Sequence, residues 1–256
     1  VVVIELPETA TVSGVFTRNA FCAAPVVVAK QHLEQCASSG LAPRYWLINT
    51  GNANAGTGEA GLQDAYASCA AVAEQAGVEQ AQVLPFSTGV IGEPLPMERL
   101  LAGLPGAFDT LADSSQAWQQ AGEGILTTDT RAKGATVTVD IGDHQVTING
   151  ITKGSGMIKP NMATMLALGP TGPMGMGGGL GPLPPSPQPF PCLFPSFQTG
   201  TVESLALNHI LHRTFFMSGF LLLLRARAQR SETRSPMRPT ISGTNYVSSR
   251  ACFFYS

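Results

Sequence analysis

Apolar and polar positions alternate regularly along residues 1–168 and divide this part of the chain into helical and strand segments. Four stretches place apolar residues three or four positions apart, which predicts helices over 25–37, 61–77, 97–104 and 115–126, the second ending at Gly77. Strands are predicted over 44–50 and 82–88, and a hairpin over 135–150 with its turn at Gly142 and Asp143. Because strands and helices alternate, the pattern predicts a layered α/β fold with helices outside a sheet.

The pattern indicates no membrane segment and no leader. The longest apolar run, Phe215 to Leu224, contains a serine and a glycine and is about half of the roughly 18 to 20 residues that a spanning helix needs. The start, VVVIELPETATVSG, lacks Met and the features of a secretory signal. We therefore expect a chain that begins inside a domain.

The two sides of Gly169 differ sharply in charge. Residues 1–168 hold 15 acids and 8 bases, whereas residues 169–256 hold 2 acids and 7 bases, all arginine. This second part opens with a dense run of Pro and Gly, which disfavours both helix and sheet, and only 201–216 has helical spacing. Arginine without lysine, together with Pro, Ser and Gly, is also typical of out-of-frame translation. We therefore expect residues 169–256 to be a disordered tail or a misread C-terminus.

Composition argues against several classes of function. The net charge of -2 gives no basic excess that would attract nucleic acid. The five cysteines follow no metal-ligand or disulfide spacing, which predicts no metal site and a reducing, cytoplasmic compartment. Cys22 and Cys69 have apolar neighbours and are interpreted as core thiols. A surface or packing role is favoured for three histidines, His144, His209 and His212.

The stretch with the most chemistry is GITKGSGMIKPNMATMLALG, residues 150–169. It is too rich in glycine for a helix, and it fails as a Walker loop because the lysine precedes the glycines. On pattern alone, Thr164 would be a buried structural threonine and Lys153 a solvated charge. By the same standard Thr88 and Gly89 would form a turn that ends a strand.

Five segments, in order, resemble the ornithine acetyltransferase family (glutamate N-acetyltransferases). Together they span about residues 12–168, which makes the resemblance far more specific than a single motif. The segments are GVFTRNAFCAAPV, LINTGNANAGTG, PFSTGVIGEPLP, GILTTDTRAKGA and GITKGSGMIKPNMATML.

The resemblance implies an αββα sandwich, incomplete here, in a protein that cuts itself between Ala163 and Thr164. Thr164 would then carry the acetyl group, with its freed α-amine as the base. The Thr88 hydroxyl and the Gly89 backbone N–H would form the oxyanion hole.

Further expectations follow from the resemblance for substrates and partners. Lys153 and Thr130 would bind the amino-acid substrates, although without the resemblance Thr130 is an ordinary loop hydroxyl. The substrates would be N-acetylornithine and glutamate in arginine biosynthesis, with no cofactor and with acetyl-CoA as an alternative donor in some members. Family members form α/β heterotetramers. Three asparagines, Asn49, Asn52 and Asn54, are interpreted as turn formers, with support of the site as the alternative.

The resemblance stops after Ala167, Leu168 and Gly169, and nothing beyond matches the second chain that completes the pocket in the family. Two alternatives to the transferase therefore stay open. One is a non-catalytic fragment whose Arg-rich tail makes weak contacts with acidic surfaces. The other is a related self-cleaving aminopeptidase, which would keep Thr164 but have no use for Lys153 as a contact to an acetylated amino acid.

Overall fold

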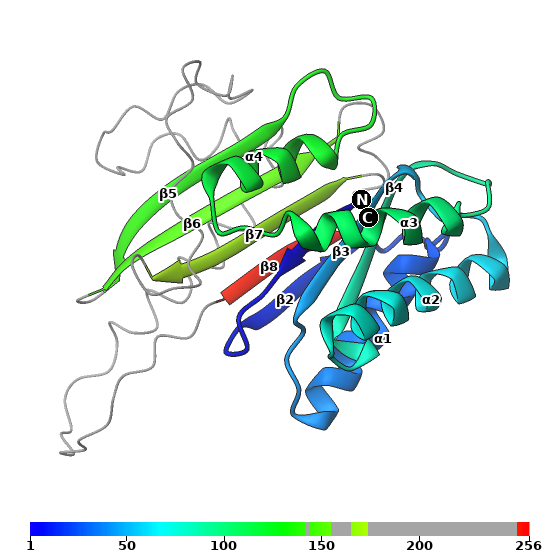
Figure 1. Cartoon of the computed structure of the whole chain (residues 1–256), viewed down its shortest axis with the longest axis horizontal. Coiled ribbons are helices and arrows are strands. Elements are labelled where there is room, and N and C mark those ends of the chain that lie inside the picture. The colour runs from blue at the N-terminus through cyan, green and yellow to red at the C-terminus, as the bar shows by residue number, and fades with distance from the viewer. Residues whose placement is uncertain (142–143, 155–164, 174–249, 256) are drawn as a thin grey trace. The chain divides into compact units, whose positions relative to one another are not determined.

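A computed structural model describes residues 1–141, 144–154, 165–173 and 250–255. These residues form two β-sheets with four α-helices and one short 3-10 helix, η1 (Figure 1). The α-helices are α1 (Ala24–Ser39), α2 (Gly58–Ala76), α3 (Met97–Asp109) and α4 (Ser115–Gly124), and η1 is Gln80–Gln82. The strands are β1 (Val2–Glu5), β2 (Thr11–Phe16), β3 (Tyr45–Asn52), β4 (Val83–Val90), β5 (Lys133–Ile141), β6 (His144–Lys153), β7 (Leu166–Pro173) and β8 (Arg250–Tyr255).

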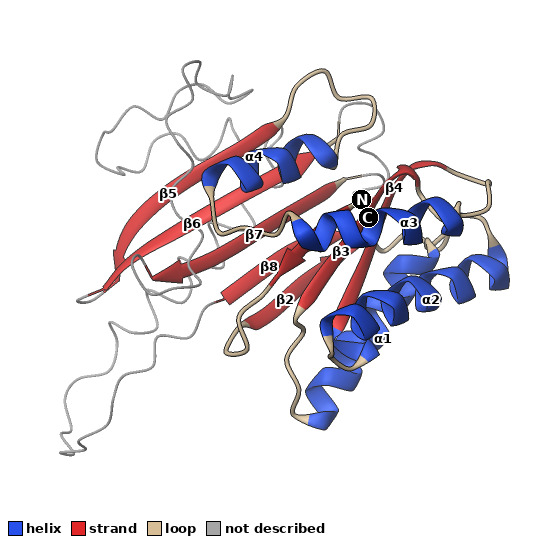
Figure 2. Ribbon diagram, viewed as in Figure 1, coloured by secondary structure: helices blue, strands red, loops and turns tan. Residues whose placement is uncertain are grey.

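The first sheet has three strands in the order β1-β3-β4. β1 pairs antiparallel with β3, and β3 pairs parallel with β4 through the crossover helix α2. The second sheet has five strands in the order β2-β8-β7-β6-β5, and all its pairs are antiparallel except β2 with β8 (Figure 2). The mixed α/β class expected from the sequence is therefore confirmed.

Strand β3 lies between two hydrophobic cores because its side chains alternate between the two faces of the sheet. Tyr45 and Leu47 belong to the core that is shared with the buried faces of α1, α2 and α3, called here the helix-side core. Trp46 and Ile48 belong to the other core, which includes residues of α4, β6 and β7. Within the described residues, the three-stranded sheet thus lies between a layer formed by α1, α2 and α3 and a second core shared with α4 and the five-stranded sheet.

The helix ends follow simple backbone rules. Gly40 and Gly77 both adopt left-handed conformations directly after α1 and α2, as expected for glycine C-caps. The predicted end of the third helix at residue 104 is wrong, since α3 continues through Pro105 to Asp109. Proline removes one hydrogen bond from a helix interior, but Phe108 packs against the helix-side core in the added turn, and this burial offsets that loss.

The predicted hairpin is confirmed by the antiparallel pairing of β5 with β6, although its turn residues 142 and 143 lie outside the described residues. Two strands were not predicted. β7 crosses the proposed boundary at residue 168, and β8 pairs with β2 and β7. The predicted helical stretch 201–216, with His209 and His212, lies outside the described residues, so the division into two regions stays a prediction.

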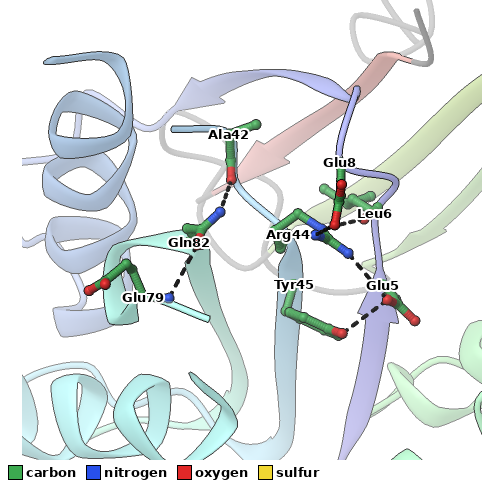
Figure 3. A network of polar contacts seen from close by, with 8 residues as sticks. All are labelled: Glu5, Leu6, Glu8, Ala42, Arg44, Tyr45, Glu79 and Gln82. Atoms are coloured by element: carbon green, nitrogen blue, oxygen red, sulfur yellow. Dashed lines mark hydrogen bonds and ion pairs between the residues drawn. The ribbon is translucent and has the colours of Figure 1, made fainter. Parts of the chain in front are cut away.

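A polar network ties together the segments that lead into β3 and β4 (Figure 3). The Arg44 guanidinium donates to the Leu6 carbonyl at 2.9 Å and to the carboxylates of Glu8 and Glu5 at 3.1 and 3.4 Å. The backbone N–H of Arg44 donates to the Gln82 carbonyl at 2.7 Å. These contacts fix the start of both strands, while the candidate site described next lies where the same strands end.

Candidate functional site

Thr88 and Gly89 lie near the end of β4, opposite Thr50 and Gly51 of β3. Gly89 has a φ of 138°, and a Cβ there would overlap the backbone of Gly51 and Asn52. Glycine is required because the two chains approach more closely than a side chain allows. Thr88 is 3% exposed, so its hydroxyl lies inside the protein rather than in a surface turn.

The three asparagines at the end of β3 and directly after it, Asn49, Asn52 and Asn54, are buried and hold the irregular backbone opposite Gly89. Asn49 donates to the Asn52 carbonyl at 2.8 Å, and the Asn52 amide donates to the carbonyls of Glu93 and Pro94 at 3.1 and 3.0 Å. The backbone N–H of Asn54 donates to Asn52 Oδ1 at 2.7 Å. The Asn54 amide donates to the Gly61 carbonyl of α2 at 2.8 Å, so the three side chains together join the β3 end to the β4–α3 connection and to α2.

Lys153, the last residue of β6, connects the two sheets. Its side chain is 4% exposed, and its ammonium donates to Thr88 Oγ1 at 2.9 Å and to Thr127 Oγ1 at 2.7 Å. The alternative of a solvated surface charge is therefore wrong. Burial lowers the pKa of Lys153, the charge of Asp129 raises it in part, and the charge of Lys133 lowers it further.

Asp129 is a buried acid beside Lys153 that the sequence interpretation missed. Its Oδ1 accepts a hydrogen bond from Lys133 and another from the Gly154 backbone N–H at 3.0 Å, and its Oδ2 lies 4.0 Å from Lys153 Nζ. Burial raises the pKa of Asp129, but these hydrogen bonds and the two lysine charges outweigh burial and leave that pKa below its usual value. The spacing of Asp129 and Lys133, four residues apart, was the available signal.

The threonine that contacts Lys153 is Thr127 rather than Thr130. Thr130 is exposed on the loop between α4 and β5, and its substrate role stays a prediction. Thr127 lies three residues earlier in the same TTDT segment, and the sequence interpretation did not single it out. Among the described residues, Lys153 thus draws together Thr88 from β4 and Thr127 from the loop.

Ala163 and Thr164 lie outside the described residues, but both ends of their segment are defined. Lys153 pairs with Leu166 across β6 and β7. At Gly154, whose φ is 143°, a Cβ would overlap the Met165 side chain. Residues 154 and 165 are therefore neighbours, and they directly follow Lys153 and directly precede its partner Leu166.

Of the remaining candidates, Cys69 is fully buried, which confirms its assignment as a core thiol, while Cys22 is partly buried at the edge of the core shared by the two sheets. Within the described ranges, His, Cys, Asp and Glu side chains do not gather into a group of three that could bind a metal ion. Nor does any helix in those ranges have the length and apolar character to cross a membrane.

Comparison with known proteins gives a consistent set of relatives. The sequence model of the ArgJ family matches residues 1–171. The arginine biosynthesis bifunctional protein ArgJ of Methylococcus capsulatus is 54% identical over 167 residues, and its counterpart in Pseudomonas fluorescens is 52% identical over 166. Each alignment covers 65% of this chain and 39% of the relative, so the chain spans about two fifths of their length.

Two solved structures are similar to this one. The crystal structure of ArgJ from Bacillus halodurans has a TM-score of 0.53 and 38% identity. The ornithine acetyltransferase of Mycobacterium tuberculosis, solved in complex with ornithine, has a TM-score of 0.50 and 32% identity. Each comparison covers 60% of this chain and 78% of the other.

Proposed function

The chain belongs to the ArgJ family, and on that premise we propose that it cleaves itself between Ala163 and Thr164 and transfers an acetyl group through Thr164. The donor is N-acetylornithine, the acceptor is glutamate, and the reaction belongs to arginine biosynthesis in the cytoplasm. The single observation that best supports this proposal is the buried Lys153 ammonium, hydrogen-bonded to Thr88 and Thr127, on the strand residue that directly precedes the segment containing Thr164.

Self-cleavage begins when the Thr164 hydroxyl attacks the Ala163 carbonyl carbon. The C–N bond then breaks, the acyl group moves to the hydroxyl oxygen as an ester, and the threonine nitrogen takes up a proton to become an amine. Water hydrolyses the ester and leaves a carboxylate on Ala163 and a free α-amine on Thr164. With a reference pKa near 8, a minority of that amine is neutral at cellular pH, and this neutral form accepts the proton of its own hydroxyl during later attacks.

The acetyl group then moves in two steps. The Thr164 oxygen attacks the acetyl carbon of N-acetylornithine, and ornithine leaves with a proton on its nitrogen. The glutamate amine attacks the resulting ester, which gives N-acetylglutamate and restores the hydroxyl. Each attack places negative charge on one oxygen, and a well-aimed donor there contributes about 3 to 4 kcal/mol.

Thr88 is suited to donate to that oxygen. Its Oγ1 accepts the hydrogen bond from Lys153, so its hydroxyl hydrogen points away from the ammonium. The close approach of β3 and β4 at Gly89 lets a backbone N–H act beside it. We assign the oxyanion hole to these two groups.

Lys153 has the charge to bind a substrate carboxylate, since two of its three ammonium hydrogens are used and one is left for a ligand. Thr127 contacts the Lys153 ammonium directly. We propose that Thr130, in the same loop, also binds the substrate. The relatives extend well beyond the matched region, so turnover by this chain requires that residues 1–168 suffice or that a partner completes the pocket. The α/β heterotetramer and acetyl-CoA as an alternative donor are part of the same proposal.

Radiolabelled acetyl transfer tests the function. The purified full chain should move label from N-acetylornithine to glutamate and should hold label on Thr164 when glutamate is omitted, and Thr164→Ala should abolish both. A wild-type chain that is cut but takes no label would favour the aminopeptidase alternative. A chain with neither cut nor label would leave the non-catalytic fragment.

A further inference from the structure

Three charged side chains meet where the loop after α4 runs beside the end of β6. Asp129 has a fully buried side chain, that of Lys153 is 4% exposed, and that of Lys133 is 28% exposed. Asp129 Oδ1 binds Lys133 and the Gly154 N–H, whereas Oδ2 is buried with no hydrogen-bond partner among the described residues. This free oxygen lies 4.0 Å from Lys153 Nζ.

The Lys153 ammonium needs a counter-charge. Its two hydrogen-bond partners are neutral hydroxyls, and a buried charge without an opposite charge nearby is strongly disfavoured. Among the described residues, Asp129 is the one carboxylate within ion-pair distance of Lys153. Lys133 is the other charged group that acts on Lys153, and it acts with the opposite sign because it repels the ammonium.

Asp129 also fixes the backbone at which the chain leaves β6. The Gly154 N–H donates to its Oδ1 at 3.0 Å, and Gly154 has a φ of 143°, a conformation that residues with a side chain rarely adopt. One carboxylate therefore holds the ammonium at the end of β6 and the first residue of the segment that leads to Thr164.

We propose that Asp129 is a positioning residue for the Lys153 site: one of its oxygens holds the ammonium against Thr88 and Thr127, and the other fixes Gly154. The catalytic meaning of this arrangement rests on the proposed function, but the arrangement itself can be measured without any turnover. Lys133 supports the same carboxylate from the more exposed side.

An NMR titration tests the charge coupling. The full chain has four lysines, so labelling lysine with carbon-13 at Cε gives few signals, and Lys153→Arg identifies the one that belongs to Lys153. In Asp129→Asn, which keeps the shape and an oxygen for Gly154, the pKa of Lys153 should fall because its attracting charge is lost. In Asp129→Glu, which keeps the charge, the pKa of Lys153 should lie closer to that of the wild type. In the control Asp109→Asn, which changes an exposed aspartate, the pKa of Lys153 should equal that of the wild type.

The wild-type chain offers a version of this test that needs no substitution. In acid, the Lys153 signal should shift a second time as Asp129 is protonated, at a pH below the usual range of an aspartate. A Lys153 signal that ignores this protonation, or an equal Lys153 pKa in wild type and Asp129→Asn, would overturn the proposal.

Self-cleavage separates this proposal from the proposed function. If the wild type is cut, Asp129→Asn should be cut about tenfold to a hundredfold more slowly, as expected for a small displacement of reacting groups, while Asp109→Asn keeps the wild-type rate. Cleavage of Asp129→Asn at the wild-type rate would contradict the positioning role. A wild-type chain that stays whole counts against the proposed function alone, because the titration still decides whether Asp129 holds Lys153.

Discussion

Replacing Gly89 by alanine should both destabilise the chain and damage the proposed oxyanion hole. The new Cβ would overlap the backbone of Gly51 and Asn52, and a φ of 138° is unfavourable for any residue with a side chain. Backbone strain and overpacking together predict a loss of about 2 to 6 kcal/mol. For a chain of this size, that loss corresponds to a fall in melting temperature of roughly 5 to 20 °C.

Gly51→Ala is the matched control, since Gly51 lies opposite Gly89 and also has a positive φ, 106°, but has open space where a Cβ would be. It should lose only the strain, about 1 to 3 kcal/mol. Thermal unfolding followed by circular dichroism measures both variants, and intact-mass spectrometry below the transition measures their self-cleavage. Equal melting temperatures for the two variants, or normal cleavage in Gly89→Ala, would refute the close-approach argument.

Three further predictions concern separate parts of the chain. Thr127→Val removes one acceptor from the buried Lys153 ammonium and should cost about 1 to 3 kcal/mol in urea unfolding, whereas the exposed Thr130→Val should change stability by less than about 0.5 kcal/mol. Burial lowers the pKa of His32 despite its hydrogen bond to the Val83 carbonyl, so the unfolded state binds more protons than the folded state. The free energy of unfolding should therefore fall as the pH drops below about 6.5. The variant His32→Gln should lose this pH dependence. Arg44→Met breaks the half-exposed network at the start of β3 and should lower the free energy of unfolding by about 1 kcal/mol without slowing self-cleavage. A clear loss of self-cleavage would show instead that the start of β3 is coupled to the candidate site at its end.

Local sequence signals were sufficient for most of the helices and strands. Gly77 ends α2 as expected because glycine adopts the left-handed conformation without steric cost, and the alternating Val and Thr residues pair as β5 and β6. Local signals fail where distant packing decides the outcome. α3 continues through Pro105 because Phe108 packs against the helix-side core. β8 pairs with β2, which lies far away in the sequence, and no local pattern predicts this pairing.

The candidate site divides in the same way. Lys153, Thr88 and Gly89 were found through the family resemblance, which carries positions but not contacts. Thr127 and Asp129 were missed because their importance arises only when the α4–β5 loop is placed beside the end of β6. The burial of Lys153 could not be predicted either, since its neutral partners come from residues 26 and 65 positions away.

Self-cleavage is tested most directly by the mass of the purified full chain after incubation at neutral pH. We expect two products, residues 1–163 and residues 164–256, with a new amino terminus at Thr164, and a single intact product for Thr164→Ala. A wild-type chain that keeps the mass of all 256 residues under these conditions would contradict the claim that Thr164 becomes a nucleophile with its own amine as base.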